Sequence, residues 1–368
     1  MTFNYHYHIK EDVLFIQSKK KRSKQGKINL SSNELLHEKS FELNKRIMKS
    51  VVEKSCINSY VYFPQFIESY AEKEGINPNN VLLSSGSDES IRIILDALAE
   101  KSGNVIIQYP EYENYFSYAD LKKINVKKIK IDRTGSMTED GNLNTILSKA
   151  NPSIFIISNP NGFTGKAKSI KELKTLAETA WQNNHIMIID EAYAAFTSLN
   201  HRELLEKYDN LIIIRSFSKK YGTAGLRLAA ILSSEKIINY LKKWNMPNSI
   251  SSIAYNFLIE IYKVSSYYND IFRDIHMSKN IIGRELEKIL KINVTSNTDT
   301  NFILLNFKKK YLAENFCAYL ADNNVIVRDL SHIKNFEGVV RMTVGSVNYM
   351  EKVLSIIKNY HLNEGLYE

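Results

Sequence analysis

Short apolar runs alternate with helical segments between residues 80 and 232, and this alternation constrains the fold more than any other feature of the sequence. The runs are rich in Ile, Leu and Val, which is typical of strands buried on both faces. Strands that alternate with helices predict an α/β fold, with a mainly parallel sheet covered by helices on both faces. The expected strands are residues 81–84, 104–108, 126–131, 153–158, 185–189, 211–214 and 226–232.

Polar or glycine-containing turns follow these strands. In open α/β sheets, binding sites lie at the carboxyl ends of the strands. We therefore expect the residues at or just after these ends to form one site. They are Gly86, Tyr112, Asn161, Asp190 and Lys219.

The pattern changes after residue 290, where shorter strands and helices indicate a smaller α+β domain. A chain of 368 residues is long enough for two domains. We expect an N-terminal arm over residues 1–35, packed against the small domain or a partner subunit. The large domain is expected over residues 36–270 and the small C-terminal domain over residues 271–368.

Composition excludes several classes of protein. The two cysteines, Cys56 and Cys317, lie far apart in the sequence, which argues against a disulfide framework and fits a reducing compartment. No apolar run approaches the roughly 20 residues that span a bilayer, and the first ten residues lack a signal-peptide core. We therefore expect a cytoplasmic protein without a membrane partner.

The formal net charge is +9. Residues 19–22 form the densest basic cluster, but short lysine runs are typical of a solvated surface, and we expect no nucleic-acid partner. A mild positive field would also steer small anionic substrates. His6 and His8 lack further ligands nearby, so we expect no metal site.

Residues 211–228 carry the clearest chemical signal. Lys219 follows a buried strand, next to the hydroxyls of Ser216 and Ser218, and Arg227 lies eight residues further on. Such a lysine can form a Schiff base with an aldehyde while its neighbours hold a phosphate. This combination suggests pyridoxal phosphate (PLP).

PLP chemistry needs few protein groups, and the sequence offers a candidate for each. A lysine binds the aldehyde and moves a proton, a carboxylate faces the pyridine nitrogen, a phenol or amide bonds the 3-oxygen and an aromatic ring stacks. Each candidate alone has another interpretation, such as a helix cap for Asp190 or a surface position for Lys219. Their joint occurrence at successive strand ends favours one site. The candidates are Lys219 for the aldehyde, Asp190 for the pyridine nitrogen, Tyr193 for the 3-oxygen and Tyr112 for stacking. The candidates for the phosphate are Ser87, Asp88, Ser216, Ser218 and Arg227.

With these motifs the chain resembles the fold-type I PLP-dependent aminotransferases of class I/II, and among them the histidinol-phosphate aminotransferases. The matching segments cover residues 28–358 almost completely. They are residues 30–34, 86–89, 109–112, 159–165, 190–193, 216–219, 224–227, 327–328 and 340–345.

The resemblance implies the same cofactor roles as the chemistry. It further implies that Arg341 binds a substrate carboxylate, with Arg328 nearby for a second anionic group and Asn33 in the substrate site. Enzymes of this kind are homodimers in which a tyrosine reaches the partner's cofactor phosphate. Tyr60 or Tyr62 is the candidate here.

The chain departs from the family pattern in three places. The family motif Asn-Pro-Asn-Asn-Pro-Thr-Gly reads Asn-Pro-Asn-Gly-Phe-Thr-Gly at residues 159–165, so Gly162 replaces the asparagine that bonds the cofactor's 3-oxygen. Either Asn161 takes this role, or Tyr193 holds the oxygen without it. Leu35-Leu36 replaces the usual Asn-Pro. Phe15-Ile16 stands where histidinol-phosphate enzymes often place a tyrosine near the substrate's phosphate.

We therefore expect transfer of an amino group from a donor such as glutamate to a small, phosphorylated ketone or keto acid. The alternative on the same scaffold is decarboxylation of a phosphorylated amino acid, as in threonine-phosphate decarboxylases, with the same Lys219 and Asp190. Those enzymes usually carry His-Gly-Gly near the N-terminus, which this sequence lacks. A third hypothesis is a regulator with the PLP fold, or a nucleic-acid-binding protein that uses the basic arm. The sequence has no helix-turn-helix module or spare domain to support it.

Overall fold

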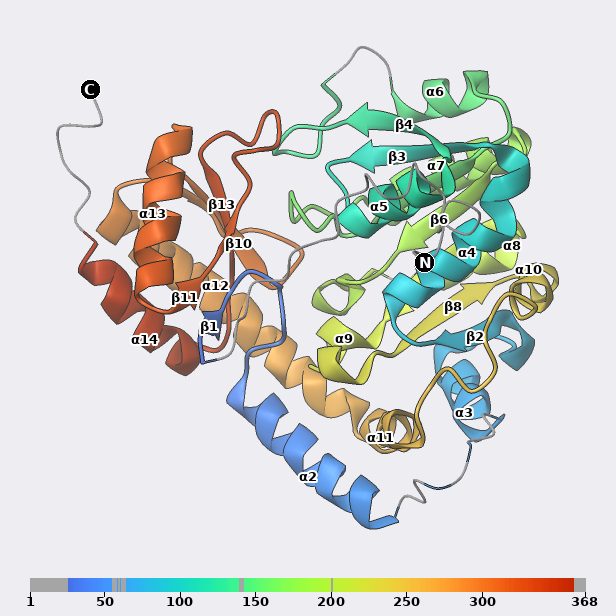
Figure 1. Cartoon of the computed structure of the whole chain (residues 1–368), viewed down its shortest axis with the longest axis horizontal. Coiled ribbons are helices and arrows are strands. Elements are labelled where there is room, and N and C mark those ends of the chain that lie inside the picture. Colours follow the sequence, from blue (N-terminus) through green and yellow to red (C-terminus); the bar gives the residue numbers. More distant parts are fainter. Residues whose placement is uncertain are drawn as a thin grey trace, which may run out of the picture.

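The structure is a computed structural model that describes residues 26–54, 58, 60, 64–138, 142–199 and 201–360. Figure 1 shows a larger part built on one wide sheet and a smaller part that contains β10 and β13. The long helix α12 (Tyr268–Leu290) extends from one part into the other. None of the helices in the described ranges has the length and apolarity needed to cross a bilayer.

A seven-stranded sheet forms the larger part, in the order β2-β8-β7-β6-β5-β3-β4. Neighbouring strands from β4 to β7 are parallel, and β8 is antiparallel to both of its neighbours. The mainly parallel sheet and the last strand that returns into it are therefore confirmed. The strands are β2 (Val81–Ser84), β3 (Asn104–Tyr109), β4 (Asn125–Lys130), β5 (Ile154–Ser158), β6 (Ile186–Asp190), β7 (Leu211–Ser216) and β8 (Ala229–Ser233).

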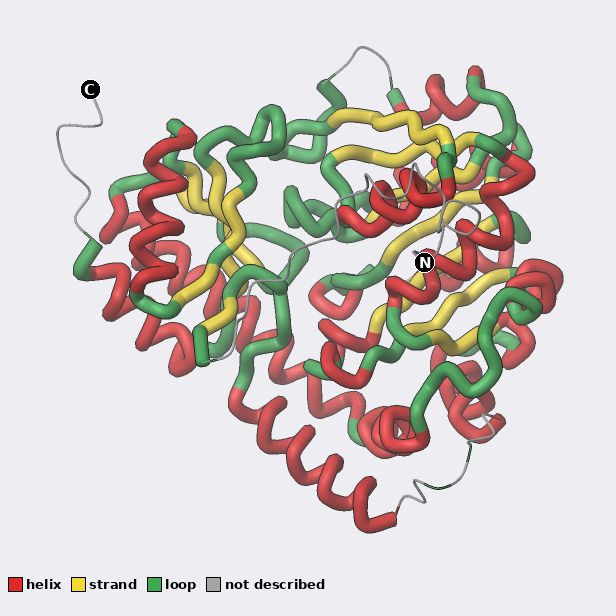
Figure 2. The backbone as a smooth tube through the Cα atoms, viewed as in Figure 1, coloured by secondary structure: helices red, strands yellow, loops and turns green. Residues whose placement is uncertain are grey.

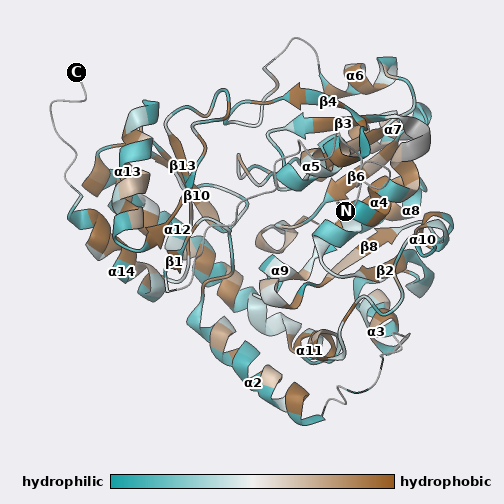
Figure 3. Ribbon diagram, in the orientation of Figure 1, coloured by the Kyte–Doolittle hydropathy of each residue, from teal (hydrophilic) through white to brown (hydrophobic). Residues whose placement is uncertain are grey.

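Both faces of this sheet are buried, which explains the continuous apolar runs. Successive residues of one strand point to opposite faces. Ile213 belongs to one hydrophobic cluster, and Ile212 and Ile214 belong to another. Figure 2 shows helices on both sides of the sheet, and Figure 3 shows that its inner strands are largely hydrophobic.

The helices divide between these two clusters. One face is covered by α2 (Glu38–Lys54), α3 (Pro64–Glu74), α6 (Leu143–Lys149), α7 (Ile170–Gln182), α8 (Arg202–Lys207) and α11 (Ser252–Lys263). The other face is covered by α4 (Ser87–Ser102), α5 (Glu113–Lys122) and α10 (Glu235–Leu241). Short helical turns complete the connections: η2 (Pro78–Asn80), η3 (Ala194–Phe196), α9 (Phe217–Lys220), η4 (Ala224–Leu226) and η5 (Ser265–Tyr267).

Local sequence signals explain several helix boundaries. Ser169 and Glu172 form a capping box, in which each side chain bonds the other's backbone N–H, so α7 begins at Ile170. Gly103 ends α4 in the left-handed conformation, with φ of 63°.

The smaller part contains a four-stranded antiparallel sheet in the order β12-β13-β10-β9. The expected strand at residues 325–328 is divided, because β11 pairs with β1 in parallel while β12 joins the larger sheet of this part. The elements are β1 (Ile28–Asn29), β9 (Asn293–Thr295), β10 (Phe302–Asn306), α13 (Lys310–Asp322), β11 (Val325–Ile326), β12 (Arg328–Asp329), β13 (Val339–Thr343) and α14 (Val347–Lys358).

The hydrophobic clusters cross the expected domain boundaries. Leu30 and Leu36 pack in the cluster of the smaller part. Helix α12 contributes Ile275 to the core of the larger part and Ile282 to that of the smaller part. The division at residues 35/36 and 270/271 stays a prediction.

Candidate active site

The carboxyl ends of the parallel strands bring the predicted turns to one edge of the sheet. Ser158 at the end of β5 pairs with Asp190 at the end of β6, and Asp190 pairs with Ile214 of β7. Strand β7 continues directly into the short helix α9, which contains Lys219.

Asp88, Tyr112 and Arg227 meet beside the first turn of α4. The Tyr112 hydroxyl donates to Asp88 Oδ1 over 2.9 Å, and Arg227 Nη2 donates to Asp88 Oδ2 over 3.0 Å. The helix begins with Ser87 after Gly86, and no side chain of the described residues caps its N-terminus. Uncapped backbone N–H groups beside a guanidinium are suited to bind an anion.

Gly86 lets this arginine approach the turn. Its φ is 88°, and a Cβ at this position would lie 2.7 Å from Arg227 Nη2. Any other residue would therefore be strained and would push the guanidinium away.

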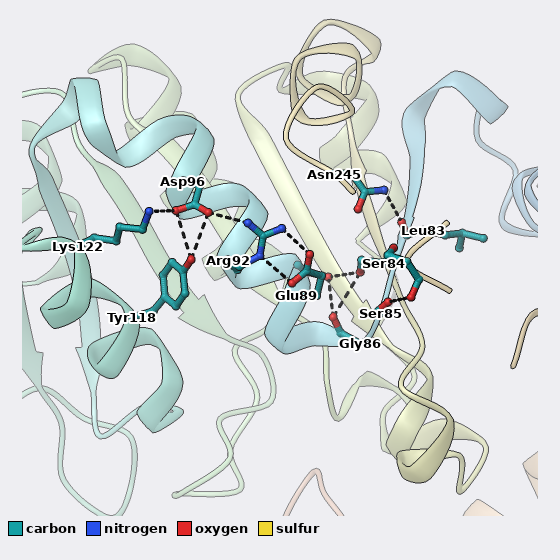
Figure 4. Close-up of polar contacts among 12 residues, drawn as sticks. Leu83, Ser84, Ser85, Gly86, Glu89, Arg92, Asp96, Tyr118, Lys122 and Asn245 are labelled. Carbon is teal, nitrogen blue, oxygen red and sulfur yellow. Dashed lines mark hydrogen bonds and ion pairs between the residues drawn. The ribbon is translucent and has the colours of Figure 1, made fainter. Parts of the chain in front are cut away.

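A chain of polar contacts joins α4 to α5 behind these residues, as Figure 4 shows. The Arg92 guanidinium bonds Glu89 and Asp96 on its own helix. Asp96 then accepts from the Tyr118 hydroxyl of α5 over 3.2 Å and pairs with Lys122 over 2.7 Å. These contacts fix the position of α4, which begins after Gly86, relative to α5, which begins after Tyr112.

Asp190 is a buried carboxylate at the end of β6. It accepts from the Tyr115 hydroxyl over 3.0 Å and from the Ala192 N–H over 3.0 Å. Within the described ranges it forms no ion pair, and burial raises its pKa to about 6 although both hydrogen bonds act to lower it. A cation placed beside it would favour its ionised form.

Glu191, the next residue, has the opposite environment. Its carboxylate contacts His201 Nδ1 and accepts from Arg215 Nε over 2.7 Å, and Arg215 also pairs with Glu74. Burial alone would raise its pKa, but Arg215 and His201 lower it to about 2. Glu191 is therefore ionised and anchors the strand end behind Asp190.

Lys219 donates from Nζ to the backbone carbonyl of Ser32, which comes from the N-terminal segment. Ser216 and Ser218 are both buried, and the Ser218 N–H donates to Ser216 Oγ over 3.3 Å.

Tyr193 lies against the same N-terminal segment. Its hydroxyl accepts from Asn33 Nδ2 over 2.8 Å, and Thr343 Oγ1 donates to Asn33 Oδ1 over 3.1 Å. Asn33 is thereby fixed from both ends of its amide. Burial raises the pKa of the Tyr193 phenol, so that it keeps its proton.

Asn161 bonds both its own loop, residues 159–165, and the turn that follows β3. Asn161 Oδ1 accepts from the N–H groups of Phe163 and Thr164, and its Nδ2 donates to the Pro110 carbonyl over 3.1 Å. A Cβ on Gly162 would lie only 3.1 Å from Tyr193 Cε2, so the tyrosine ring occupies the space beside this glycine.

The two arginines lie opposite each other on paired strands, Arg328 on β12 and Arg341 on β13. The buried Arg341 guanidinium donates to the carbonyls of Gly162 and Ser31, while its Nε has no hydrogen-bond partner among the described residues. Arg328 is half-exposed and pairs with Glu113 at the start of α5.

Two tyrosines, Tyr60 and Tyr62, were predicted to reach the partner's cofactor phosphate. Tyr60 is 78% exposed, and Tyr62 lies outside the described residues. In the ranges that the structure describes, no three His, Cys, Asp or Glu side chains come together as metal ligands.

The sequence pattern of the family "Aminotransferase class I and II" matches residues 25–357. The chain belongs to this family of aminotransferases. Its cofactor is PLP. The chain is 28% identical over 345 residues to the histidinol-phosphate aminotransferase of Clostridium novyi (strain NT). The aligned region covers 92% of this chain and 93% of that protein.

Solved structures share the fold of this aminotransferase. The histidinol-phosphate aminotransferase of Sinorhizobium meliloti in complex with PLP superposes with a TM-score of 0.78, at 18% identity, over 90% of each chain. The L-threonine-O-3-phosphate decarboxylase of Porphyromonas gingivalis superposes with a TM-score of 0.75, at 18% identity, over 90% of this chain and 98% of that one. Similarity at this level shows a common fold and leaves the reaction open.

Sequence reasoning missed two residues of the aminotransferase site. Tyr115 is the hydrogen-bond donor to Asp190, and its position three residues after Tyr112, near the start of a helix, was the available signal. Glu111 is a buried acid in the turn between Pro110 and Tyr112. An acid next to the expected stacking residue was the available signal for it.

Proposed function

We propose that this aminotransferase moves an amino group from a donor such as glutamate to a small, phosphorylated ketone or keto acid. Lys219 is the lysine that binds the cofactor aldehyde, and Asp190 is the partner of the ring nitrogen. Tyr112 stacks on the ring, and Arg341 and Arg328 bind the anionic groups of the substrates.

The pairing of the two arginines carries this proposal. Side chains at directly opposite positions of an antiparallel pair lie on the same face of the sheet. Arg341 retains one buried N–H donor that has no partner among the described residues, and a substrate carboxylate suits it. Arg328 lies opposite it and is half-exposed, so a second anionic group such as a phosphate can reach it. Two guanidinium groups fit one substrate with two anionic groups, or two different anions in turn.

The protein groups fit PLP. The uncapped start of α4, with the Ser87 and Asp88 N–H groups, and Arg227 form a site for its phosphate, completed by Ser216 and Ser218. Asp190 is buried and forms no ion pair with another described residue, so it fits a protonated ring nitrogen. When bound, PLP supplies an aldehyde that takes up the amino group and a ring that accepts electrons.

The protein's own groups then perform four tasks. Lys219 removes the proton from the α-carbon of the amino donor and delivers a proton to the carbonyl carbon of the acceptor. Arg341 fixes the substrate carboxylate and so sets the orientation of that carbon. Tyr193 accepts a hydrogen bond from Asn33 and can donate its own proton to the 3-oxygen. Both ends of the Asn161 amide already bond protein groups, the Phe163 N–H and the Pro110 carbonyl, and this supports Tyr193 rather than Asn161 in the role.

We further propose that the protein is a cytoplasmic homodimer in which both subunits contribute to each active site. Tyr60 or Tyr62 would reach the cofactor phosphate of the partner subunit. The exposed side chain of Tyr60 is compatible with such a contact.

Lys219→Ala tests the catalytic assignment, with Lys220→Ala as the matched control on the next residue. We expect Lys219→Ala to lose the absorbance of protein-bound PLP and all turnover, because no other amine takes the place of the nucleophile. Lys220→Ala should keep both. Full activity in Lys219→Ala would refute the assignment.

A second experiment identifies the acceptor. The PLP-loaded protein is mixed with glutamate, and phosphorylated ketones are screened for the ability to return the cofactor to its aldehyde form. Failure of glutamate, alanine and aspartate to convert the cofactor contradicts transamination. Release of carbon dioxide from phosphothreonine or phosphoserine, without any keto acid, would instead assign the decarboxylase activity.

A further inference from the structure

Glu111 is a buried acid in the middle of the site that none of the proposed steps uses. It lies in the turn between β3 and α5 and is only 2% exposed. Its Oε1 accepts from the Tyr112 N–H over 2.8 Å and from the Ser158 hydroxyl over 2.6 Å. Its Oε2 accepts from the Ser158 N–H over 3.0 Å.

In all three hydrogen bonds the Glu111 carboxylate is the acceptor. An ionised carboxylate only accepts hydrogen bonds, and it matches this set of donors completely. The bonds join the backbone of Tyr112 to Ser158, the last residue of β5. Because Ser158 pairs with Asp190 on the neighbouring strand, Glu111 links the two residues that would lie on the face and at the nitrogen of the cofactor ring.

Ionisable groups from two elements surround this carboxylate. The charge of Asp190, at the end of β6, acts on Glu111, and the charge of Glu111 acts on Tyr115 of α5 and on Tyr193, which follows β6. Burial raises the pKa of Glu111 to about 7, while its hydrogen bonds to Ser158 and Tyr112 lower it. The acid therefore changes its charge near neutral pH.

We propose that Glu111 is a positioning residue of the cofactor site, whose ionised carboxylate holds Tyr112 at the end of β5 beside Asp190. The inference rests on the proposed stacking role of Tyr112. Burial of a carboxylate is costly, and an uncharged side chain would serve a purely structural turn. Protonation of one oxygen reduces the acceptor capacity of the carboxyl group and so weakens the set of bonds that joins Tyr112 to Ser158.

The test measures PLP binding to the apoprotein at pH 6, 7 and 8, in the wild-type chain and in Glu111→Gln. If binding requires the ionised form of one group with a pKa of about 7, affinity falls about tenfold from pH 8 to pH 6. We expect Glu111→Gln to bind PLP more weakly at pH 8 and to lose this tenfold component. Asp190 is present in both proteins, so a pH dependence that persists in Glu111→Gln is assigned to Asp190.

Ser158→Ala is the second variant, and it keeps the charge of Glu111. Removal of the hydroxyl that lowers the pKa of Glu111 should move the midpoint of the pH dependence upward. Unchanged PLP binding in Glu111→Gln, an equal loss at every pH, or an unmoved midpoint in Ser158→Ala would overturn the inference. A failure of the wild-type chain to transaminate would refute the proposed function and leave this binding test intact.

Discussion

Restoring the family asparagine at Gly162 tests how this site is built. Gly162→Asn brings back the asparagine of the family motif, although Phe163 still stands in place of the motif's proline. From the motif alone, higher activity would be expected. The contacts of Gly162 lead to the opposite expectation. The Cβ would lie 3.1 Å from Tyr193 Cε2 and 3.6 Å from its hydroxyl, so the ring must move by a few tenths of an ångström before the rest of the side chain is accommodated.

This movement has a calculable cost. Overpacking of a filled site costs about 1–3 kcal/mol. Displacement of the ring also lengthens the 2.8 Å bond from Asn33 to the Tyr193 hydroxyl, and a typical hydrogen bond contributes about 1 kcal/mol. If about 2 kcal/mol of the total is lost in the transition state, kcat/KM falls about thirtyfold.

The assay is kcat/KM for the reaction with glutamate, together with the Tm of each protein. Gly162→Ala provides the intermediate step, since it adds only the Cβ, and its loss should be smaller than that of Gly162→Asn. Equal or higher kcat/KM in Gly162→Asn would show that Tyr193 moves without cost and would refute the reasoning.

Two further predictions concern charged pairs. Glu113→Gln should lower KM for phosphorylated acceptors by up to about fivefold and leave KM for glutamate unchanged. The reason is that the half-exposed Glu113 carboxylate competes with the acceptor for Arg328. A higher KM for phosphorylated acceptors would contradict this. Glu191→Gln should destabilise the protein by about 3 kcal/mol at neutral pH, since the pKa of Glu191 falls from 4.5 to about 2 on folding. This stabilisation is present above pH 4.5 and is lost as the pH falls toward 2. Denaturant unfolding at stepped pH should therefore show that the difference in free energy of unfolding between the two proteins shrinks. A difference that stays constant would contradict the lowered pKa of Glu191.

The parallel sheet could be predicted because its signal is local. An apolar run such as residues 211–214 is buried on both faces, and this burial leaves a continuous pattern in the sequence. The pairing of short edge strands has no such signal. Residues 325–328 read as one strand, yet Val325 pairs with Ile28 while Arg328 pairs with Arg341. The partners of such short strands are chosen by distant parts of the chain, which periodicity does not report.

The same distinction applies to the candidate site. The expectation that polar residues follow the strand ends placed Asp190 and Lys219 at one edge of the sheet, because topology alone determines that edge. Individual hydrogen bonds were beyond this reasoning. The Ser32 carbonyl contacts Lys219 and the Asn33 amide contacts Tyr193, and both come from a segment far away in sequence. Contacts of this kind depend on side-chain positions that only the packed structure specifies.

The residues around Gly162 give a physical reason for its departure from the family motif. Its carbonyl accepts from Arg341, and the space that a side chain would take is filled by Tyr193, which is held by Asn33. Three proposed substrate and cofactor residues therefore meet around the glycine that breaks the motif. Residues in contact are not energetically independent. The loss of the family asparagine is thus one part of a coupled arrangement, and Gly162→Asn combined with Tyr193→Phe should cost less than the sum of the two single changes. Strict additivity of the two effects on kcat/KM would show that the glycine and the tyrosine act separately.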